Sequence, residues 1–303
     1  MGNVRSRPYS DRVALPAISL PPAFDTEPDF SPPVYPGRTD ELVIAPDGLP
    51  ARVVKAHNAH KKHYIERYTG IVAAAMKNKW GGLAYVDTYC GPGWCWVKDT
   101  GEWVVGSPLI ALGVQPAYSH FAFVDNDSVC IDALERRVAG MEAKPHFKCA
   151  DSNDSATIAW VRSVIPRRGT LTLALLDPQG CTLEPATIEA LTQDRPMDLM
   201  INLPIQGLLR CLATGKLFHV VERVLGPDYP RCALKDWRVA VREHYRDLLG
   251  GFGYAYTSSK EVRGEKTRSP LYDFIMASKH PLAKKLFEGA TRDNAHGQIS
   301  MLD

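Results

Sequence analysis

Between residues 83 and 203, short apolar runs alternate with helical segments, and this alternation limits the possible folds more than any other feature of the chain. Short strands with continuous apolar side chains are buried on both faces, which is typical of a parallel sheet covered by helices. The expected strands are Leu83–Asp87, Phe121–Asp125, His146–Asp151, Leu171–Asp177 and Asp198–Leu203, and the expected helices are Pro108–Val114, Ser128–Ala139, Asp154–Val164 and Glu184–Thr192.

The pattern changes after Leu203. A helical stretch is expected near residues 205–249, followed by two β-like runs, Tyr254–Val262 and Leu271–Ala277, around a polar loop. Such a pair suits an antiparallel hairpin at the edge of the sheet. The sequence therefore predicts an α/β fold with helices on both faces, residues 51–303 forming one domain that contains a helical insertion near 205–249.

Residues 1–50 carry ten of the 23 prolines of the chain. Proline removes a backbone donor and favours extended conformations, so we expect a proline-rich N-terminal arm here and not a domain. Two alternatives are open: a disordered extension, or an arm that wraps the body through Phe24, Phe30 and Tyr35. In either case, a chain starting near Arg52 is predicted to fold.

Four of the expected strands end in an aspartate: Asp87, Asp125, Asp151 and Asp177. Ligands of open α/β sheets bind outside the carboxyl ends of the strands, so the four carboxylates are expected along one rim. A single aspartate at such a position is commonly a helix cap or turn residue. Four in order favour a binding rim.

The first strand runs into Asp87-Thr88-Tyr89-Cys90-Gly91-Pro92-Gly93, where Gly91 and Gly93 allow the main chain to approach a ligand. A dinucleotide-binding loop requires a third glycine where Trp96 stands, which disfavours a nicotinamide cofactor. Asp125 is placed to accept hydrogen bonds from two ribose hydroxyls, since a carboxylate is only an acceptor. Asp151 is expected to meet an adenine amino group or, alternatively, to be a helix cap.

The segment Asp177-Pro178-Gln179-Gly180 follows the fourth strand, where a substrate would meet a reactive cofactor group. Asp177 is our candidate for accepting a hydrogen bond from an attacking amine, while Pro178 supplies rigidity and a free carbonyl beside Gln179. The alternative is an ordinary turn, because Asp-Pro and Gln-Gly both favour one.

Together these segments resemble the three-Cys-motif partner protein family of class I S-adenosylmethionine-dependent methyltransferases, over about residues 55–290. The matching segments are Lys61-Lys62, Tyr85-Val86-Asp87 with Gly91-Pro92-Gly93, Gly106-Ser107-Pro108-Leu109, Phe123-Val124-Asp125, Leu176-Asp177-Pro178-Gln179-Gly180 and Tyr272-Asp273-Phe274-Ile275. In tRNA guanine N2 methyltransferases the similar segment reads Asp-Pro-Phe-Gly, so Gln179 replaces an aromatic residue and base stacking at this position is in doubt.

The resemblance implies a Rossmann-like class I methyltransferase fold with a seven-stranded, mostly parallel sheet. It also implies S-adenosyl-L-methionine as cofactor and, as a possible partner, a separate protein that carries the three cysteines. The candidate cofactor-binding residues are Asp87, Tyr89, Gly91, Gly93, Asp125, Asn126, Asp151 and Ser152, and the candidate catalytic residues are Asp177, Pro178 and Gln179.

An insertion follows Gly93 and runs to the next helix, for which Ser107 is the expected cap and Pro108 the first residue. It is expected to form a small hairpin over the cofactor. Trp94 and Trp96 are candidates for stacking on a flat substrate or on the adenine, with packing in the core as the alternative.

No metal site is expected, because His57, His60 and His63 drift around a helix without a completing carboxylate or cysteine. A second group consists of basic residues and could form a rim that faces phosphate, although Glu261 and Glu265 reduce its positive charge. Its members are Lys55, Lys61, Lys62, Arg67, Lys260, Arg263, Lys266 and Arg268.

The seven cysteines are odd in number and never spaced Cys-x-x-Cys, which favours a reducing, cytoplasmic location. No run of about 18 apolar residues suits a membrane span, so no membrane partner is expected. Two functions stay open. One is an enzyme that methylates an amine nitrogen on a nucleobase, nucleoside or heteroaromatic small molecule, free or within a nucleic acid. The other is a cofactor-binding partner subunit with weak or absent catalysis.

Overall fold

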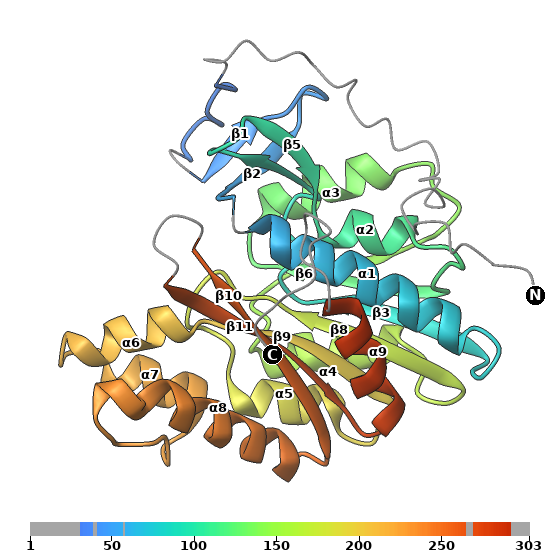
Figure 1. Ribbon diagram of the computed structural model, residues 1–303. Helices are drawn as coiled ribbons and strands as arrows, with labels where there is room; N and C mark the ends of the chain where they lie inside the picture. Colours follow the sequence, from blue (N-terminus) through green and yellow to red (C-terminus); the bar gives the residue numbers. More distant parts are fainter. Residues whose placement is uncertain (1–30, 39–40, 57, 265–268, 292–303) are drawn as a thin grey trace, which may run out of the picture.

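The computed structural model describes residues 31–38, 41–56, 58–264 and 269–291 (Figure 1). Its strands are β1 (Leu42–Ile44), β2 (Pro50–Val54), β3 (Gly82–Asp87), β4 (Trp94–Val97), β5 (Glu102–Val105), β6 (His120–Asp125), β7 (His146–Cys149), β8 (Thr170–Leu176), β9 (Met197–Leu203), β10 (Tyr256–Arg263) and β11 (Pro270–Ser278). Its helices are α1 (Asn58–Met76), α2 (Ser107–Gly113), α3 (Ser128–Val138), α4 (Ser155–Val164), α5 (Pro185–Thr192), α6 (Ile205–Ala213), α7 (Phe218–Leu225), α8 (Leu234–Gly251) and α9 (Pro281–Thr291).

The larger sheet has seven strands in the order β10-β11-β9-β8-β3-β6-β7. Strands β3, β6, β7, β8 and β9 run parallel, while β11 is antiparallel to both β9 and β10. The chain builds outward from β3 to β7 and then returns to β8 on the other side of β3. The carboxyl ends of β3 and β8 therefore form the topological switch point where open α/β sheets bind ligands. The predicted fold class is confirmed, including the hairpin of β10 and β11.

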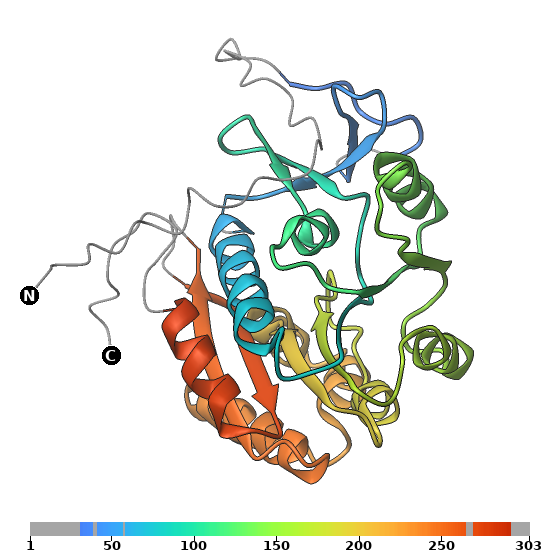
Figure 2. The same ribbon diagram turned by 90° about the vertical axis from the view of Figure 1, so that its right-hand side faces the viewer.

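Alternate residues of the central strands point to opposite faces of this sheet, and each face carries its own core. Leu83 and Tyr85 of β3 pack with residues from α1, α2, α3 and α9, whereas Ala84 and Val86 pack with residues from α4, α5 and the α6–α8 segment. Figures 1 and 2 both show α1 and α9 side by side on the first face. Helices thus cover both faces, and the predicted helical insertion near 205–249 corresponds to α6, α7 and α8.

A second, four-stranded sheet has the order β1-β2-β4-β5 and combines the N-terminal segment with the predicted hairpin of residues 94–105. Strand β2 runs parallel to β4 and pairs Arg52 with Cys95. The pairing gives the N-terminal segment a fixed position beside the seven-stranded sheet, with Ala51 in the same core cluster as Tyr85.

This second sheet changes the domain boundary that the sequence suggested. Leu42 is fully buried, Val43 is 6% exposed, and β1 pairs with β2 across the expected boundary at residue 50. These strands were not recognised in the sequence because β1 has only three residues and lies within a proline-rich segment. Tyr35 is half-buried and donates its N–H to the Leu42 carbonyl, while Phe24 and Phe30 lie outside the described residues. The described chain is therefore packed from before residue 51.

No helix among the described residues combines the length and the apolar character needed to cross a membrane.

Candidate functional site

Asp87 ends β3 at the switch point, and its carboxylate is fully buried. It accepts hydrogen bonds from the Tyr89 N–H (3.1 Å) and from the Ser107 hydroxyl (2.5 Å). Ser107 was expected to cap α2, but Gly106 occupies the N-cap position and the hydroxyl turns to Asp87 instead. Burial raises the pKa of Asp87 to about 7, although both hydrogen bonds oppose the rise. Asp87 thus lies just behind Tyr89 and Ser107, which line the adjoining cavity.

The glycine loop after β3 needs glycine at both predicted positions. Gly91 and Gly93 have φ values of 62° and 89°, which side chains of L-residues rarely adopt. A Cβ atom on Gly93 would lie 2.9 Å from the Leu134 side chain, so this glycine also lets the loop pack against α3. Gly91 lines the cavity and donates its N–H to the Asp125 carboxylate at 2.8 Å.

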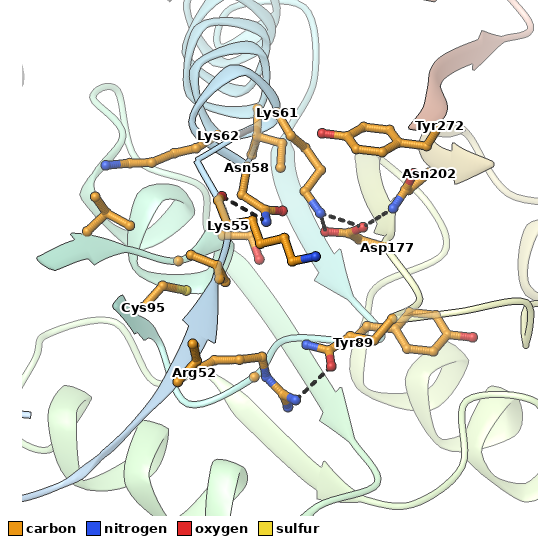
Figure 3. A pocket seen from close by; sticks show the side chains of 18 of the residues that line it. Arg52, Lys55, Asn58, Lys61, Lys62, Tyr89, Cys95, Asp177, Asn202 and Tyr272 are labelled. Carbon is orange, nitrogen blue, oxygen red and sulfur yellow. Dashed lines mark hydrogen bonds and ion pairs between the residues drawn. The ribbon is translucent and has the colours of Figure 1, made fainter. Parts of the chain in front are cut away.

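Asp125 ends β6 next to this loop and is 6% exposed. Its second oxygen accepts the Asp127 N–H at 3.0 Å, so the carboxylate ties two loops of the rim together. Arg52 of β2 approaches from outside, with 3.7 Å between a guanidinium nitrogen and Asp125. The same guanidinium donates to the Gln179 side chain at 2.8 Å (Figure 3). Arg52 therefore crosses the rim from Asp125 to the loop after β8.

Beside this rim lies a cavity of about 660 Å³. Figure 3 shows Asp177 at its wall, at the carboxyl end of β8, facing Lys61 of α1 and Asn202 of β9. The Lys61 ammonium lies 2.7 Å and 2.9 Å from the two oxygens of Asp177 and 5.6 Å from the centre of the Tyr272 ring. Asn202 donates its side-chain N–H to Asp177 at 2.8 Å. Asp177 is thus an ion-paired residue of the cavity wall.

Asn202 is only 8% exposed, and its side-chain oxygen has no hydrogen-bond partner. Because a carboxylate only accepts hydrogen bonds, the amide nitrogen must face Asp177 and the oxygen must face elsewhere. A buried polar atom without a partner costs roughly 1–3 kcal/mol, which makes this oxygen a candidate acceptor for a donor group of a ligand. Asn202 lines the same cavity as Asp177.

The remaining rim residues lie outside this cavity. Asp151 is exposed and accepts the Asn153 N–H at 2.9 Å, while the N-cap residue of α4 is Asp154. Ser152 is buried and donates its hydroxyl to the Thr88 carbonyl. Asn126 lines a neighbouring hollow of about 430 Å³ together with Arg52 and Gln179. Of these three residues, Asn126 is the one that the structure places at this hollow.

The expected stacking role of Trp94 and Trp96 is not what the structure shows. Both indoles are 4% exposed and pack in the core, with ring centres 6.2 Å and 4.7 Å from that of Trp103. Neither lines the cavity, although Cys95 between them does, because alternate residues of β4 point to opposite sides. The pairing of β4 with both β2 and β5 fixes this orientation.

The basic residues that were expected to face phosphate do not lie together in the structure. Lys55, Lys61 and Lys62 line the cavity, but Arg67 donates to the Gly289 carbonyl and Arg263 pairs with Glu261. Lys266, Arg268 and His57 lie outside the described residues, as does the side chain of His60. Within the described residues, no cluster of three or more His, Cys, Asp or Glu side chains is arranged to hold a metal ion.

Three residues that line the cavity were not predicted from the sequence: Arg52, Asn202 and Arg210. Asn202 interrupts the apolar run from Leu199 to Leu203, and a polar residue near the carboxyl end of such a run was the available signal. Arg52 and Arg210 gave no local signal, since only the tertiary fold brings β2 and α6 to the switch point.

Comparison with known proteins fits this description of the fold. No family model matches the chain, and neither does any curated protein. Among solved structures, protein LPL1258 from Legionella pneumophila str. Philadelphia 1 matches with a TM-score of 0.50 at 12% identity, over 80% of this chain and 94% of that one. The O-methyltransferase from Bacillus cereus in complex with SAH gives 0.41 at 10% identity, over 70% and 79% of the two chains. The N-methyltransferase NodS from Bradyrhizobium japonicum WM9 gives 0.36 at 9%, over 72% and 98%.

The chain has a Rossmann-like fold of the class I methyltransferase type. The strand order and the antiparallel β11 show this directly, and the likeness to LPL1258 concerns the fold alone at 12% identity. Membership of the three-Cys-motif partner protein family stays a prediction.

Proposed function

We propose that this protein is an S-adenosyl-L-methionine-dependent methyltransferase that acts on an amine nitrogen of a nucleobase, nucleoside or heteroaromatic small molecule. The observation that carries the proposal is the pair of acceptors at the ends of β8 and β9. Asn202 offers a buried oxygen without a partner, next to the Asp177 carboxylate, in a cavity that also includes the glycine loop.

The rim residues fit this cofactor. Gly91 and Gly93 hold the main chain in a conformation that allows close approach, and Asp125 lies directly beside them, where two ribose hydroxyls would be accepted. Asp87 is fully buried behind Tyr89 and Ser107 with only two neutral hydrogen-bond donors, so its negative charge would favour an ammonium group of the cofactor from behind the cavity wall. The roles of Asn126 and Asp151 around the adenine remain part of the proposal.

When bound, the cofactor supplies a methyl group on a sulfonium; the nitrogen–carbon bond forms as the carbon–sulfur bond breaks and its electron pair goes to sulfur. The residues of this chain have to orient the amine. Asp177 already accepts two hydrogen bonds on one oxygen and one on the other, so a carboxylate with about four acceptor positions retains room for one N–H.

Asn202 offers the second acceptor. An amine whose two N–H groups are held by Asp177 and Asn202 has its lone pair directed away from both residues. Fixed orientation of this kind provides a large part of the reduction in the barrier to methyl transfer. Pro178 is buried and fixes the chain behind Asp177. Gln179 holds Arg52, which links this loop to the cofactor rim.

Calorimetry with S-adenosylhomocysteine, followed by turnover with methyl-labelled cofactor against a panel of primary aromatic amines, tests the proposal. We expect binding of one molecule per chain and label transfer to nitrogen. If the protein does not bind S-adenosylhomocysteine, the proposal is wrong. Binding without transfer to any amine would instead favour the cofactor-binding partner subunit.

A further inference from the structure

The cavity beside Asp177 is lined by more basic than acidic side chains. The basic residues are Arg52, Lys55, Lys61, Lys62 and Arg210, and the acidic ones are Glu102 and Asp177. They come from β2, the following loop, α1 and α6, so no single helix end or charge run accounts for the excess. Figure 3 shows Lys55 and Lys61 directed towards Asp177, while Arg52 lies on the side of the pocket nearer Tyr89.

These cations differ in how well they are matched. Lys61 is paired with Asp177, whereas burial lowers the pKa of Lys62 despite the opposing charges of Glu66 and Glu102. Arg52 donates to the neutral side chains of Gln179 and Cys130 but lies 3.7 Å from the nearest carboxylate, Asp125, and its buried Nε–H has no partner. No ion pair joins Lys55 or Arg210 to another of the described residues. Around Cys95, four cations oppose the rise that burial causes in the pKa of the thiol: Arg52, Lys61, Lys62 and Arg137. The wall formed by Arg52 and Lys55 is therefore electropositive.

An electropositive wall is unfavourable for the proposed reaction unless an anion joins it. The cofactor is itself cationic, because its ammonium and sulfonium groups outnumber its carboxylate, and like charges repel strongly in a partly desolvated cavity. Charge-assisted hydrogen bonds to a carboxylate or phosphate remove this repulsion and satisfy the free guanidinium N–H. We propose that the methyl acceptor is a small amine-bearing molecule with a carboxylate or phosphate group, which Arg52 and Lys55 bind while Asp177 and Asn202 hold its amine.

The distribution of the other cations favours a small molecule over a nucleic acid. A polynucleotide backbone needs basic side chains along an extended path. Among the described residues, Arg67 is turned to the carbonyl of Gly289, and Glu261 pairs with both Arg242 and Arg263. Arg67 and Arg263, two of the basic residues expected to face phosphate, are thus engaged with other partners away from the cavity. This inference rests on the proposed methyltransferase function and adds the acceptor's charge to it.

The test uses the full chain saturated with S-adenosylhomocysteine and two matched pairs of probes at low salt: para-aminobenzoate with aniline, and adenosine monophosphate with adenosine. The first pair tests a carboxylate and the second a phosphate. We expect the charged member of at least one pair to bind about tenfold more tightly than its neutral partner. Lys55→Gln should remove most of that advantage, Lys55→Arg should retain it, and Lys77→Gln, an exposed lysine at the far end of α1, should leave it unchanged.

Three results would overturn the inference. One is equal binding, or no binding, for the charged and neutral members of both pairs. Another is a loss of S-adenosylhomocysteine affinity in Lys55→Gln, because Lys55 would then serve the cofactor's own carboxylate. The third is tight binding of a single-stranded oligoribonucleotide with no binding of the small probes. If S-adenosylhomocysteine fails to bind the wild type, the proposed function fails, and the same pairs titrated on the free protein still decide whether the anion site exists.

Discussion

The two halves of the site are built differently. The cofactor half, formed by Asp87, Gly91, Gly93 and Asp125, comes from one stretch of about 40 residues, and its carboxylates accept backbone N–H groups of the same rim. The acceptor half, formed by Lys61, Asp177, Asn202 and Tyr272, draws one residue each from α1, the end of β8, β9 and β11. The cofactor half is preformed by local geometry, whereas the acceptor half depends on the correct packing of distant elements.

The two halves also differ in charge. In the cofactor half, burial without a nearby cation raises the pKa of Asp87. In the acceptor half, the carboxylate of Asp177 is matched by a lysine ammonium and an amide. A substitution in the cofactor half should therefore act mainly on binding, and one in the acceptor half mainly on methyl transfer. The following predictions test this division, from the largest expected effect to the smallest.

The largest effect is expected from a chain that begins at Arg52. This truncation removes β1 and the first residues of β2, including the fully buried Leu42. Loss of one buried leucine side chain alone costs about 2–5 kcal/mol, and the support of Arg52 and Lys55 is lost with it. We expect a marked fall in the thermal midpoint by calorimetry or circular dichroism. A truncated chain as stable as the full one would show that the N-terminal segment is dispensable, as the prolines suggested.

Asp177→Ala should separate the two halves most sharply. Without the carboxylate, the amine loses an orienting acceptor and Lys61 loses its partner, and misplacement of a reacting group costs on the order of 100-fold in rate. Single-turnover measurements should show this loss, with S-adenosylhomocysteine affinity nearly unchanged. Asp177→Asn should retain more activity, since its oxygen still accepts a hydrogen bond. Wild-type transfer rates in both variants would reduce Asp177 to a structural turn residue.

Asp125→Ala should act in the opposite way, on binding. Hydrogen bonds to a charged group contribute about 1.5–3 kcal/mol, so we expect S-adenosylhomocysteine to bind about 10- to 100-fold more weakly by calorimetry. Asp127→Ala is the matched control, because Asp127 caps α3 two residues away. Unchanged affinity in Asp125→Ala, with the fold intact, would contradict the ribose assignment.

The pKa of Asp87 predicts a pH dependence that is specific to the cofactor half. With a pKa of about 7 in the free protein, the carboxyl is mostly protonated at pH 6, and its ionised form favours binding of an ammonium. Cofactor affinity should therefore rise by up to about tenfold per pH unit towards pH 7 and then level off. Asp87→Asn should abolish this rise. Any titration of the ligand itself affects the variant and the wild type equally, so it cancels in the comparison. A parallel slope in the variant would assign the dependence to another group.

The same group has the opposite effect on stability. Since its pKa in the folded protein lies above the ordinary value of 3.8, the folded state holds the proton more tightly. The contribution of Asp87 to the free energy of unfolding is thus complete below about pH 4 and is lost as the pH rises through 7. Asp87→Asn should flatten this part of the stability profile.

What the sequence allows one to predict follows the same division. Strand periodicity identified β3, β6, β8 and β9 within one residue of their bounds, and the glycine loop was readable because positive φ angles leave a composition signal. Asn202 and Arg52 were not found, since their roles depend on contacts with residues 25 and 127 positions away in the chain. The sequence left the tryptophans of β4 open between stacking and core packing, because burial on one side of a four-residue strand depends on its pairing partners.

The smallest effect on the site is expected from Trp96→Phe. The Trp96 ring lies on the core side of β4, packed against Trp103 and close to Gly101, whose added Cβ would lie 3.6 Å from the indole. Trimming a buried indole to a phenyl ring leaves a cavity and should cost about 1–2 kcal/mol in the free energy of unfolding. Binding of S-adenosylhomocysteine and of the charged probes should stay within about twofold of the wild type. The Trp96 ring does not line the binding cavity, so the loss of buried apolar surface lowers the stability of the fold without changing the binding contacts. Trp103→Phe, which trims the facing ring, is the matched control and should behave alike. If Trp96→Phe weakens probe binding tenfold at unchanged stability while Trp103→Phe does not, the indole reaches the acceptor and the stacking role predicted from the sequence is restored.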